Sequence, residues 1–283
     1  MIVTRSIKKT SQICARCNSK DKTIGFVPTM GALHEGHMSL VKRARKECGF
    51  VVVSIFLNPI QFGPSEDLAR YPRNFKKDEK LLKASGADLL FYPEASAMYP
   101  QGFSTYVEEF DLSKELCGKS RPGHFRGVCT VLAKLFNIVK PDIAYFGQKD
   151  YQQTQIVKKM VRDLNYDIRI KMLSTIREKD KLAMSSRNTY LSLKERKESS
   201  CLYRALIFAK ELIRKGERDP KKVIAKMRGV VKSEKTTKID YIGIVNADSL
   251  ERINKIKGRI LITVAVYVGK ARLIDNIVLH VKK

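Results

Sequence analysis

The chain has 283 residues, of which 43% are hydrophobic, so it is long enough to bury a large core in one domain or two. Its formal net charge is +26, from 55 Lys and Arg against 29 Asp and Glu. Such a charge fits either a nucleic-acid partner or a lysine-rich surface with an anionic substrate. The cations are spread along the whole chain, and aromatic residues are not interleaved where they are densest, at residues 210–238. We therefore expect no nucleic acid as the main partner.

The sequence also argues against a membrane or secreted protein. No stretch approaches the ~18 consecutive apolar residues of a membrane span, and residues 1–12 contain no apolar signal core. The six cysteines are scattered: Cys14, Cys17, Cys48, Cys117, Cys129 and Cys201. Cys14 and Cys17 have zinc-knuckle or redox spacing, but no second pair faces them, so we expect six reduced thiols. These features predict a cytoplasmic protein with no membrane partner.

Strand-like and helix-like stretches alternate in the first part of the chain. Apolar runs rich in β-branched and aromatic residues, at 23–29 and 50–56, enclose a helical pattern at 36–48, which predicts a strand–helix–strand unit. Later stretches continue the alternation: helical at 74–85, strand-like at 88–93, helical at 125–139, strand-like at 142–147, helical at 151–164 and strand-like at 167–173. This alternation predicts a doubly wound α/β domain with a parallel sheet over residues 1–175.

The pattern changes after residue 175. Two helical stretches, at 193–215 and 220–233, are followed by three strand-like runs, at 239–247, 259–268 and 272–281. Helices followed by consecutive strands predict a smaller α+β domain over residues 176–283.

Two histidines, His34 and His37, follow the strand predicted at residues 23–29, in the stretch VPTMGALHEGHMSL. The zinc-protease helix motif needs histidines four apart, so this pair, three apart, does not match it. The first loop of an α/β unit, at a helix N-terminus, gathers backbone N–H groups and the positive end of the helix dipole, which favours phosphate. We therefore interpret both histidines as phosphate ligands. An H-x-G-H signature in this place resembles the nucleotidylyltransferase superfamily, which includes the class I aminoacyl-tRNA synthetases.

Two further segments carry groups that suit phosphate binding. REKDKLAMSSRN, at residues 177–188, offers two hydroxyls and a guanidinium at the predicted junction between the domains. YFGQKDYQQ, at residues 145–153, follows a strand, where ligands bind in open α/β sheets. Its Lys149 would place a positive charge near the phosphates, and its Asp150 would bind a ribose or help to hold Mg²⁺.

Polar residues of two more segments suit recognition of a small substrate. Asn58 and Gln61, in FLNPIQFG, again follow a strand, and their amides suit hydroxyl and carboxylate groups better than acid–base work. In RPGHFRG, Arg121, His124 and Arg126 lead into a helix.

The chain resembles the pantoate–β-alanine ligase family over essentially its whole length. Six motifs occur in the order found in that family: VPTMGALHEGHMSLV, VSIFLNPIQFGPSEDLARYPR, RPGHFRGV, PDIAYFGQKDYQQ, MSSRN and ARLIDN. The resemblance implies a Rossmann-like N-terminal domain, a smaller C-terminal domain acting as a lid, and a homodimer. It also implies Mg²⁺- and ATP-dependent condensation of pantoate with β-alanine, through a pantoyl-adenylate, in coenzyme A biosynthesis.

The same resemblance implies which residues form the site. The ATP site would comprise Met30, Gly31, Ala32, Leu33, His34, Glu35, Gly36, His37, Gly147, Gln148, Lys149, Asp150, Ile176, Met184, Ser185, Ser186 and Arg187. Of these, the catalytic donors would be His34, His37, Lys149 and Arg187. Pantoate and β-alanine would be bound by Asn58, Gln61, Arg121 and Gln153. We expect no metal held by the protein alone; Mg²⁺ would be bound with ATP, with Asp150 as its candidate ligand.

Two positions depart from the family pattern. Gln148 stands where the family commonly has Glu, which removes a charge but keeps hydrogen bonding. Lys181 stands where the family commonly has Gly, and a lysine there stiffens the loop.

Two other functions remain open. One alternative is another small-molecule nucleotidylyltransferase, with no use for β-alanine. The other is a tRNA-binding protein on a synthetase-like core, which would need a basic groove and binding that falls steeply with salt.

Overall fold

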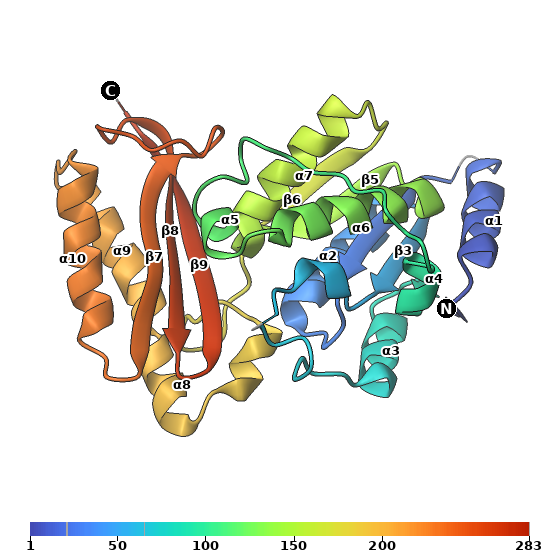
Figure 1. The fold of residues 1–283 in the computed structure, drawn as a ribbon, viewed down its shortest axis with the longest axis horizontal. Coiled ribbons are helices and arrows are strands. Elements are labelled where there is room, and N and C mark those ends of the chain that lie inside the picture. The colour runs from blue at the N-terminus through green and yellow to red at the C-terminus, as the bar shows by residue number, and fades with distance from the viewer. Residues whose placement is uncertain (21, 65, 283) are drawn as a thin grey trace. The chain divides into compact units, whose positions relative to one another are not determined.

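The computed structural model describes residues 1–20, 22–64 and 66–282, and the chain divides into two compact units (Figure 1). The first unit comprises Met1–Phe110, Arg121–Gln148 and Gln153–Ser174. The second comprises Asp111–Ser120, Lys149–Gln152 and Thr175–Lys283. The second unit therefore includes two short segments from before residue 175 in addition to the C-terminal part of the chain.

The first unit is built on a six-stranded sheet in the order β1-β4-β3-β2-β5-β6, and each neighbouring pair is parallel. The strands are β1 (Ile2–Thr4), β2 (Ile24–Thr29), β3 (Phe50–Ile55), β4 (Leu89–Phe91), β5 (Ile143–Gly147) and β6 (Arg169–Leu173). Strand order reverses between β2 and β5, which is where doubly wound sheets bind their ligands. The predicted parallel α/β fold is confirmed.

Helices cover this sheet; those that begin at residues 35, 75, 124 and 151 were predicted from the sequence, whereas those that begin at residues 7 and 95 were not. They are α1 (Ile7–Asn18), α2 (Glu35–Glu47), α3 (Phe75–Ala84), α4 (Ala95–Met98), α6 (His124–Val139) and α7 (Tyr151–Asp163), with the short 3₁₀ helices η1 (Pro59–Gln61) and η2 (Gln148–Asp150). Helix α2 packs on β2, β3 and β5 and also contacts α3, whereas α1 contacts α6 and β2. No helix in the described ranges is long and apolar enough to cross a membrane.

The core of the first unit explains why its central strands are apolar throughout. Val51, Val52 and Val53 of β3 have no exposed surface, and neither have Phe26 and Val27 of β2. A parallel strand covered by helices on both faces buries every side chain, so its sequence shows no alternation.

The second unit contains the smaller α+β fold. Strands β7 (Thr237–Asn246), β8 (Gly258–Val268) and β9 (Ala271–Val281) form an antiparallel sheet in chain order. Helices α9 (Cys201–Arg214) and α10 (Pro220–Lys232) contact each other and the sheet (Figure 1). Two shorter helices, α5 (Cys117–Ser120) and α8 (Leu193–Ser199), complete the unit. The helix predicted over residues 193–215 is therefore two helices, α8 and α9, which meet at Ser200.

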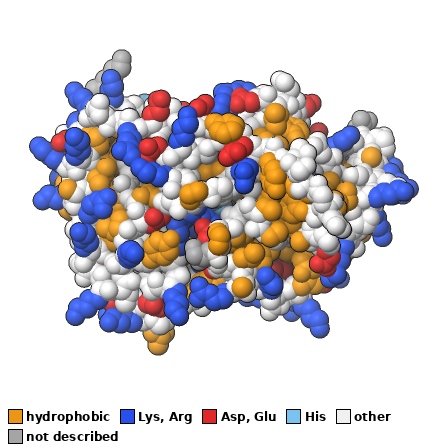
Figure 2. Space-filling view, in the orientation of Figure 1, with side chains coloured by type: hydrophobic (Ala, Val, Ile, Leu, Met, Phe, Trp, Pro, Cys, Tyr) orange, Lys and Arg blue, Asp and Glu red, His pale blue; other side chains and the backbone are white. Residues whose placement is uncertain are grey.

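Thiols and surface charge agree with the sequence-based expectations. All six cysteines lie in the described ranges, and all are free thiols. Figure 2 shows Lys and Arg side chains interspersed with acidic and apolar side chains over the visible face. On this face the cationic side chains are thus not gathered in a single patch.

Candidate active site

The loop after β2 is held in a left-handed conformation by a buried carboxylate. Gly31 and Ala32 have φ angles of 85° and 51°. Asp78, which is 2% exposed on α3, accepts hydrogen bonds from the backbone N–H groups of Ala32 and Leu33, both at 2.8 Å. These two bonds compensate the unfavourable left-handed backbone at Ala32. Burial raises the pKa of Asp78, although the bonds from Leu33 and Ala32 oppose that shift.

The two histidines form a reciprocal cap at the start of α2. His34 is the N-cap residue, and its Nδ1 accepts a hydrogen bond from the Gly36 N–H at 3.1 Å. The Nδ1 of His37 accepts from the His34 N–H at 3.3 Å, and the two ring centroids lie 4.1 Å apart. Because Nδ1 is the acceptor in both rings, the proton of each neutral imidazole is on Nε2. Each histidine is thus set to act as a donor through its Nε2–H.

Most of the backbone N–H groups near the two histidines that have been described are not available to a phosphate. Several N–H groups at the start of α2 and in the preceding loop are already bonded to protein side chains, namely Asp78 and the histidines. The interpretation of this loop as an anion site therefore depends more on the imidazole Nε2 atoms than on the backbone. In the described part of the chain there is no group of three or more His, Cys, Asp or Glu that could hold a metal.

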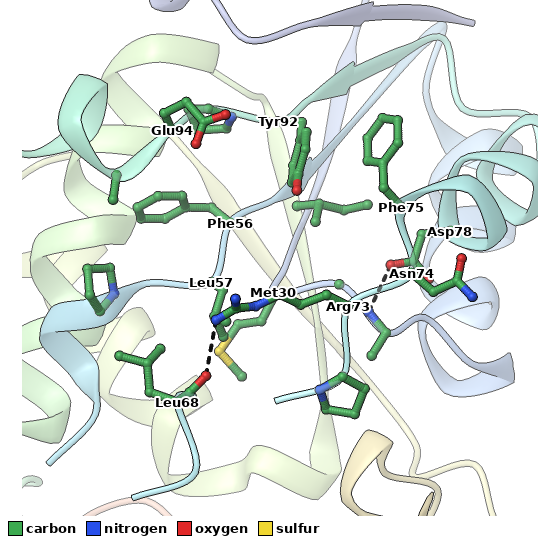
Figure 3. Close-up of a pocket in the computed structure, with 17 residues that line it drawn as sticks. Met30, Phe56, Leu57, Leu68, Arg73, Asn74, Phe75, Asp78, Tyr92 and Glu94 are labelled. Atoms are coloured by element: carbon green, nitrogen blue, oxygen red, sulfur yellow. Dashed lines mark hydrogen bonds between the residues drawn. The ribbon is translucent and has the colours of Figure 1, made fainter. Parts of the chain in front are cut away.

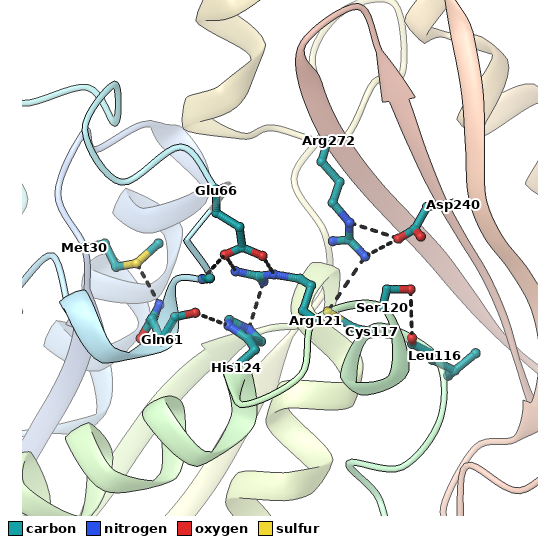
Figure 4. A network of polar contacts seen from close by, with 11 residues as sticks. Met30, Gln61, Glu66, Leu116, Cys117, Ser120, Arg121, His124, Asp240 and Arg272 are labelled. Atoms are coloured by element: carbon teal, nitrogen blue, oxygen red, sulfur yellow. Dashed lines mark hydrogen bonds and ion pairs between the residues drawn. The ribbon is translucent and has the colours of Figure 1, made fainter.

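Two hydrogen bonds fix the side-chain amide of Gln61 in η1, and Figure 4 shows the one to Met30. Its Oε1 accepts from Asn58 Nδ2 at 3.0 Å, and its Nε2 donates to Met30 Sδ at 2.9 Å. Asn58 is 1% exposed; it also donates to the Gly127 carbonyl at 3.0 Å and accepts from the Tyr99 hydroxyl at 2.8 Å. Asn58, which was predicted to contact substrate, is thus buried and holds Gln61 in place.

Arg121 was also predicted to bind substrate, but its guanidinium is paired with protein groups (Figure 4). It forms a two-bond ion pair with Glu66, with N–O distances of 2.5 and 2.6 Å. It also contacts His124 Nε2 at 2.9 Å, and His124 Nδ1 lies 2.8 Å from the Gln61 carbonyl oxygen. Burial alone would raise the pKa of Glu66, but the hydrogen bond and charge of Arg121 outweigh it and lower that pKa. In this arrangement Arg121 supports the Gln61 backbone through His124.

A cavity of about 340 Å³ lies beside the loop that follows β2 (Figure 3). Its walls come from the carboxyl ends of three strands, with Met30 after β2, Phe56 after β3 and Tyr92 after β4. Arg73 and Asp78 also line it, and Arg73 donates to the Leu68 carbonyl at 3.2 Å. None of Asp78, Arg73 and Tyr92 was predicted from the sequence as a site residue. The position of Tyr92 directly after a strand was the available signal.

In the second unit, Lys149 and Asp150 form a close pair of opposite charges. Lys149 Nζ lies 3.7 Å from Asp150 Oδ1, and the side chains are 20% and 47% exposed. Asp150 is a partly exposed carboxylate, and Mg²⁺ that arrives with a nucleotide typically takes about one or two protein carboxylates together with phosphate and water oxygens.

The segment before MSSRN is a tight hairpin with a strained residue. Met184 N–H donates to the Ile176 carbonyl at 3.0 Å, and Arg177 pairs with Ala183 in an antiparallel bridge. Lys181 has a φ of 73°, at a position where Gly is the favoured residue. Beyond the hairpin, Ser185 is the N-cap residue of η3 (Ser186–Tyr190), and its hydroxyl accepts from the Arg187 N–H at 3.3 Å.

The remaining predicted residues lie at the ends of β5 and α7. Gly147 is the last residue of β5, Gln148 begins η2, and Gln153 is in the first turn of α7 and half-buried. Within the first unit the structure brings Met30 and Gln61 into contact. Within the second unit it connects Lys149 with β9, because Asn276 Nδ2 donates to the Lys149 carbonyl at 2.9 Å.

Comparison with known proteins gives full-length matches to one family. A family model described as pantoate-beta-alanine ligase matches residues 2–278. Pantothenate synthetase of Caldicellulosiruptor bescii is 53% identical over 282 residues, which cover 100% of both chains. Pantothenate synthetase of Thermosipho melanesiensis is 55% identical over 278 residues, covering 98% of this chain and 99% of the relative.

Solved structures of the same kind superpose on the chain. Pantothenate synthetase from Thermus thermophilus matches with a TM-score of 0.93 and 43% identity, covering 98% of this chain and 99% of that one. Pantoate-beta-alanine ligase from Francisella tularensis, complexed with beta-gamma ATP and beta-alanine, matches with a TM-score of 0.79 and 37% identity over 98% and 97% of the two chains.

Proposed function

Because the chain belongs to the pantoate-beta-alanine ligase family, we propose that it joins pantoate to β-alanine in two steps, through a pantoyl-adenylate, with Mg²⁺-ATP as the energy source. The full-length family match over residues 2–278 carries this conclusion. The reciprocal cap of His34 and His37, at the carboxyl edge of β2 where the strand order reverses, supports it.

The first step transfers an adenylyl group. A pantoate carboxylate oxygen attacks the α-phosphorus of ATP, and the bond from that phosphorus to the bridging oxygen of pyrophosphate breaks. In the second step the β-alanine amine attacks the acyl carbon, the acyl C–O bond breaks, AMP leaves with that oxygen, and the amine loses a proton. Both steps need positioned substrates and donors for developing charge more than they need a protein nucleophile.

In this proposal the phosphate donors come from four positions along the chain. The Nε2–H groups of His34 and His37 donate to phosphate oxygens, since their Nδ1 atoms accept protein N–H groups. Lys149 and Arg187 supply permanent positive charge to the same anion. Mg²⁺ bound with ATP would neutralise phosphate charge, and Asp150 would be its protein ligand.

The rest of the nucleotide would be held by the residues that the family motifs mark. These are Met30, Gly31, Ala32, Leu33, Glu35, Gly36, Gly147, Gln148, Ile176, Met184, Ser185 and Ser186. Asp78 supports this proposal because it fixes the backbone of Ala32 and Leu33 within that set.

Pantoate would be bound by the amides of Gln61 and Gln153. Gln61 is 8% exposed and fixed by Asn58, so its amide is preorganised for a small ligand at little entropic cost. Asn58 and Arg121 would act through Gln61, since both are engaged with protein groups.

Three further parts of the proposal rest on family resemblance. We expect a homodimer, a cytoplasmic location and a lid role for residues 176–283. Light scattering of the purified protein tests the first, because a homodimer has twice the 32.3 kDa chain mass.

The decisive assay follows products from purified protein with Mg²⁺-ATP and pantoate, with and without β-alanine. We expect AMP and pantothenate in equal amounts only when all components are present. ATP cleavage that continues without pantoate, or ADP as product, would contradict the proposal.

A further inference from the structure

The motif ARLIDN, in β9, contacts the candidate site through Asn276, which donates to the Lys149 carbonyl. Its Asp275 and Asn276 are consecutive, and they are only 1% and 3% exposed. Neighbouring residues of a strand point to opposite faces of the sheet. One dipeptide can therefore hold a different segment of the chain on each face of β9.

Asp275 holds the hairpin that leads into MSSRN. Its carboxylate accepts from both terminal nitrogens of Arg177, at 2.6 and 2.9 Å. The Arg177 guanidinium also donates to the Lys181 carbonyl at 3.0 Å and lies over the Tyr203 ring, 4.5 Å from its centroid. The Asp275 side chain is completely buried and that of Arg177 is 18% exposed, so solvent screens this ion pair little. The start of the hairpin and its left-handed residue are both tied to β9.

Asn276 holds the segment that carries Lys149. Its Nδ2 donates to the Lys149 carbonyl at 2.9 Å. That bond fixes the backbone of η2 where the Lys149 side chain leaves it. Burial raises the pKa of the Asp275 carboxyl, although the hydrogen bond and charge of Arg177 and, to a smaller extent, the charge of Lys149 oppose that shift. The dipeptide therefore holds two segments, the Lys149 segment through Asn276 and the hairpin through Asp275.

We propose that Asp275 and Asn276 are positioning residues, which hold the Lys149 segment and the 176–184 hairpin in one fixed arrangement for binding the phosphates of ATP. The inference rests on the proposed roles of Lys149 and Arg187 as phosphate donors. Neither Asp275 nor Asn276 needs to touch the nucleotide. Their effect arises because a misplacement of ~1 Å at a reacting group can cost ~10²-fold in rate.

The test begins with Asn276→Leu, which keeps the side-chain size and removes the donor. We expect the dissociation constant of Mg²⁺-ATP, measured by calorimetry, to rise about tenfold, and pantoyl-adenylate formation to slow about 10²-fold. The dissociation constant of pantoate should change less than about threefold, because pantoate is held by the amides of Gln61 and Gln153 in this proposal.

A double-mutant cycle separates positioning from a general structural role. If Asn276 acts through Lys149, Asn276→Leu should cost almost nothing further in a Lys149→Ala background. Additive losses would overturn the inference. Val223→Ala, at a fully buried position of α10, is the stability control. It should lower the melting temperature but leave the ATP dissociation constant unchanged. If Val223→Ala raised that constant as much as Asn276→Leu does, the result would also count against positioning.

The role proposed for Asp275 is tested with Asp275→Asn, in a second double-mutant cycle with Arg187→Ala. This variant leaves Arg177 without its charge partner and can fail to fold, in which case Asn276→Leu decides the matter. The calorimetric readout does not depend on turnover. A wild-type protein that makes no AMP would refute the proposed function, whereas an unchanged ATP dissociation constant in Asn276→Leu refutes the positioning role alone.

Discussion

Gly127 of α6 lies against the backbone that carries Gln61, and its replacement by alanine should perturb both folding and pantoate use. A Cβ atom at Gly127 would lie 2.5 Å from the Ile60 carbonyl oxygen, 2.6 Å from Gln61 Cα and 2.7 Å from Gln61 N. All three are backbone atoms, which cannot move aside as a flexible side chain can. Either α6 or η1 must therefore shift.

The magnitude follows from two opposing terms. Alanine in a helix interior is favoured over glycine by about 1 kcal/mol. Overpacking a filled core costs typically about 1–3 kcal/mol, and three backbone contacts below 3 Å place Gly127→Ala at or above the upper limit. The net loss should be about 2 kcal/mol, or roughly 4–8 °C in melting temperature at about 2–4 °C per kcal/mol. Because η1 moves with Gln61, kcat/KM for pantoate should fall by up to about 10²-fold.

The matched control is Gly229→Ala in α10. Gly229 is an exposed helical glycine, and a Cβ there would meet no heavy atom within 4 Å. Only the helix-propensity term remains, so this variant should be more stable by about 1 kcal/mol, with unchanged pantoate kinetics. Thermal unfolding and pantoate-dependent AMP release measure both effects. The reasoning is refuted if the two variants shift the melting temperature in the same direction, or if Gly127→Ala keeps full pantoate efficiency.

Three other substitutions test separate parts of the structure. Lys181→Gly removes about 1–2 kcal/mol of left-handed strain, but it makes the unfolded chain more flexible, which costs about 0.4–1 kcal/mol. The first effect is larger, so the melting temperature should rise slightly. A lower melting temperature would be inconsistent with a strained hairpin. His37→Ala should slow adenylate formation by roughly 10²–10³-fold but affect the attack of β-alanine on supplied pantoyl-adenylate much less. Equal losses in both half-reactions would exclude a role confined to phosphate. Glu47 accepts hydrogen bonds from Lys171 and Tyr145, which lower its pKa from 4.5 to about 2. Its contribution to stability is therefore complete above about pH 4.5 and is lost as the pH falls toward about 2, so the free energy of unfolding should fall less steeply there in Glu47→Gln. Identical slopes in that variant and the wild type would show that Glu47 carries no such linkage.

The elements that could be predicted from the sequence were those with a strong local pattern. The apolar run of β3 and the cationic end of α2 are visible within a short window of the chain. Helix α1 and strand β1 were missed; β1 has only three residues, and two of them, Ile2 and Val3, are exposed at 45% and 38%. A short edge strand carries too little hydrophobic signal to be distinguished from a loop.

The contacts that the candidate site residues make could not be predicted from the sequence. Asp78 lies 45 residues beyond Leu33, whose N–H group donates to it, and no spacing rule connects two such positions. For the same reason no local pattern indicated that Glu66, 55 residues earlier in the chain, would occupy the guanidinium of Arg121. Lys181 is different: the family pattern has Gly at this position, and Gly is the residue that favours positive φ, so the observed φ of 73° could have been inferred from the sequence.

The most direct test of the two-step mechanism uses pantoate labelled with ¹⁸O in its carboxylate. If the carboxylate attacks the α-phosphorus and the amine later breaks the acyl C–O bond, one labelled oxygen must pass to AMP in each turnover. Mass spectrometry of the products should therefore show AMP with one ¹⁸O and pantothenate with one ¹⁸O in its amide carbonyl. Unlabelled AMP, or a label in pyrophosphate or phosphate, would contradict a pantoyl-adenylate intermediate.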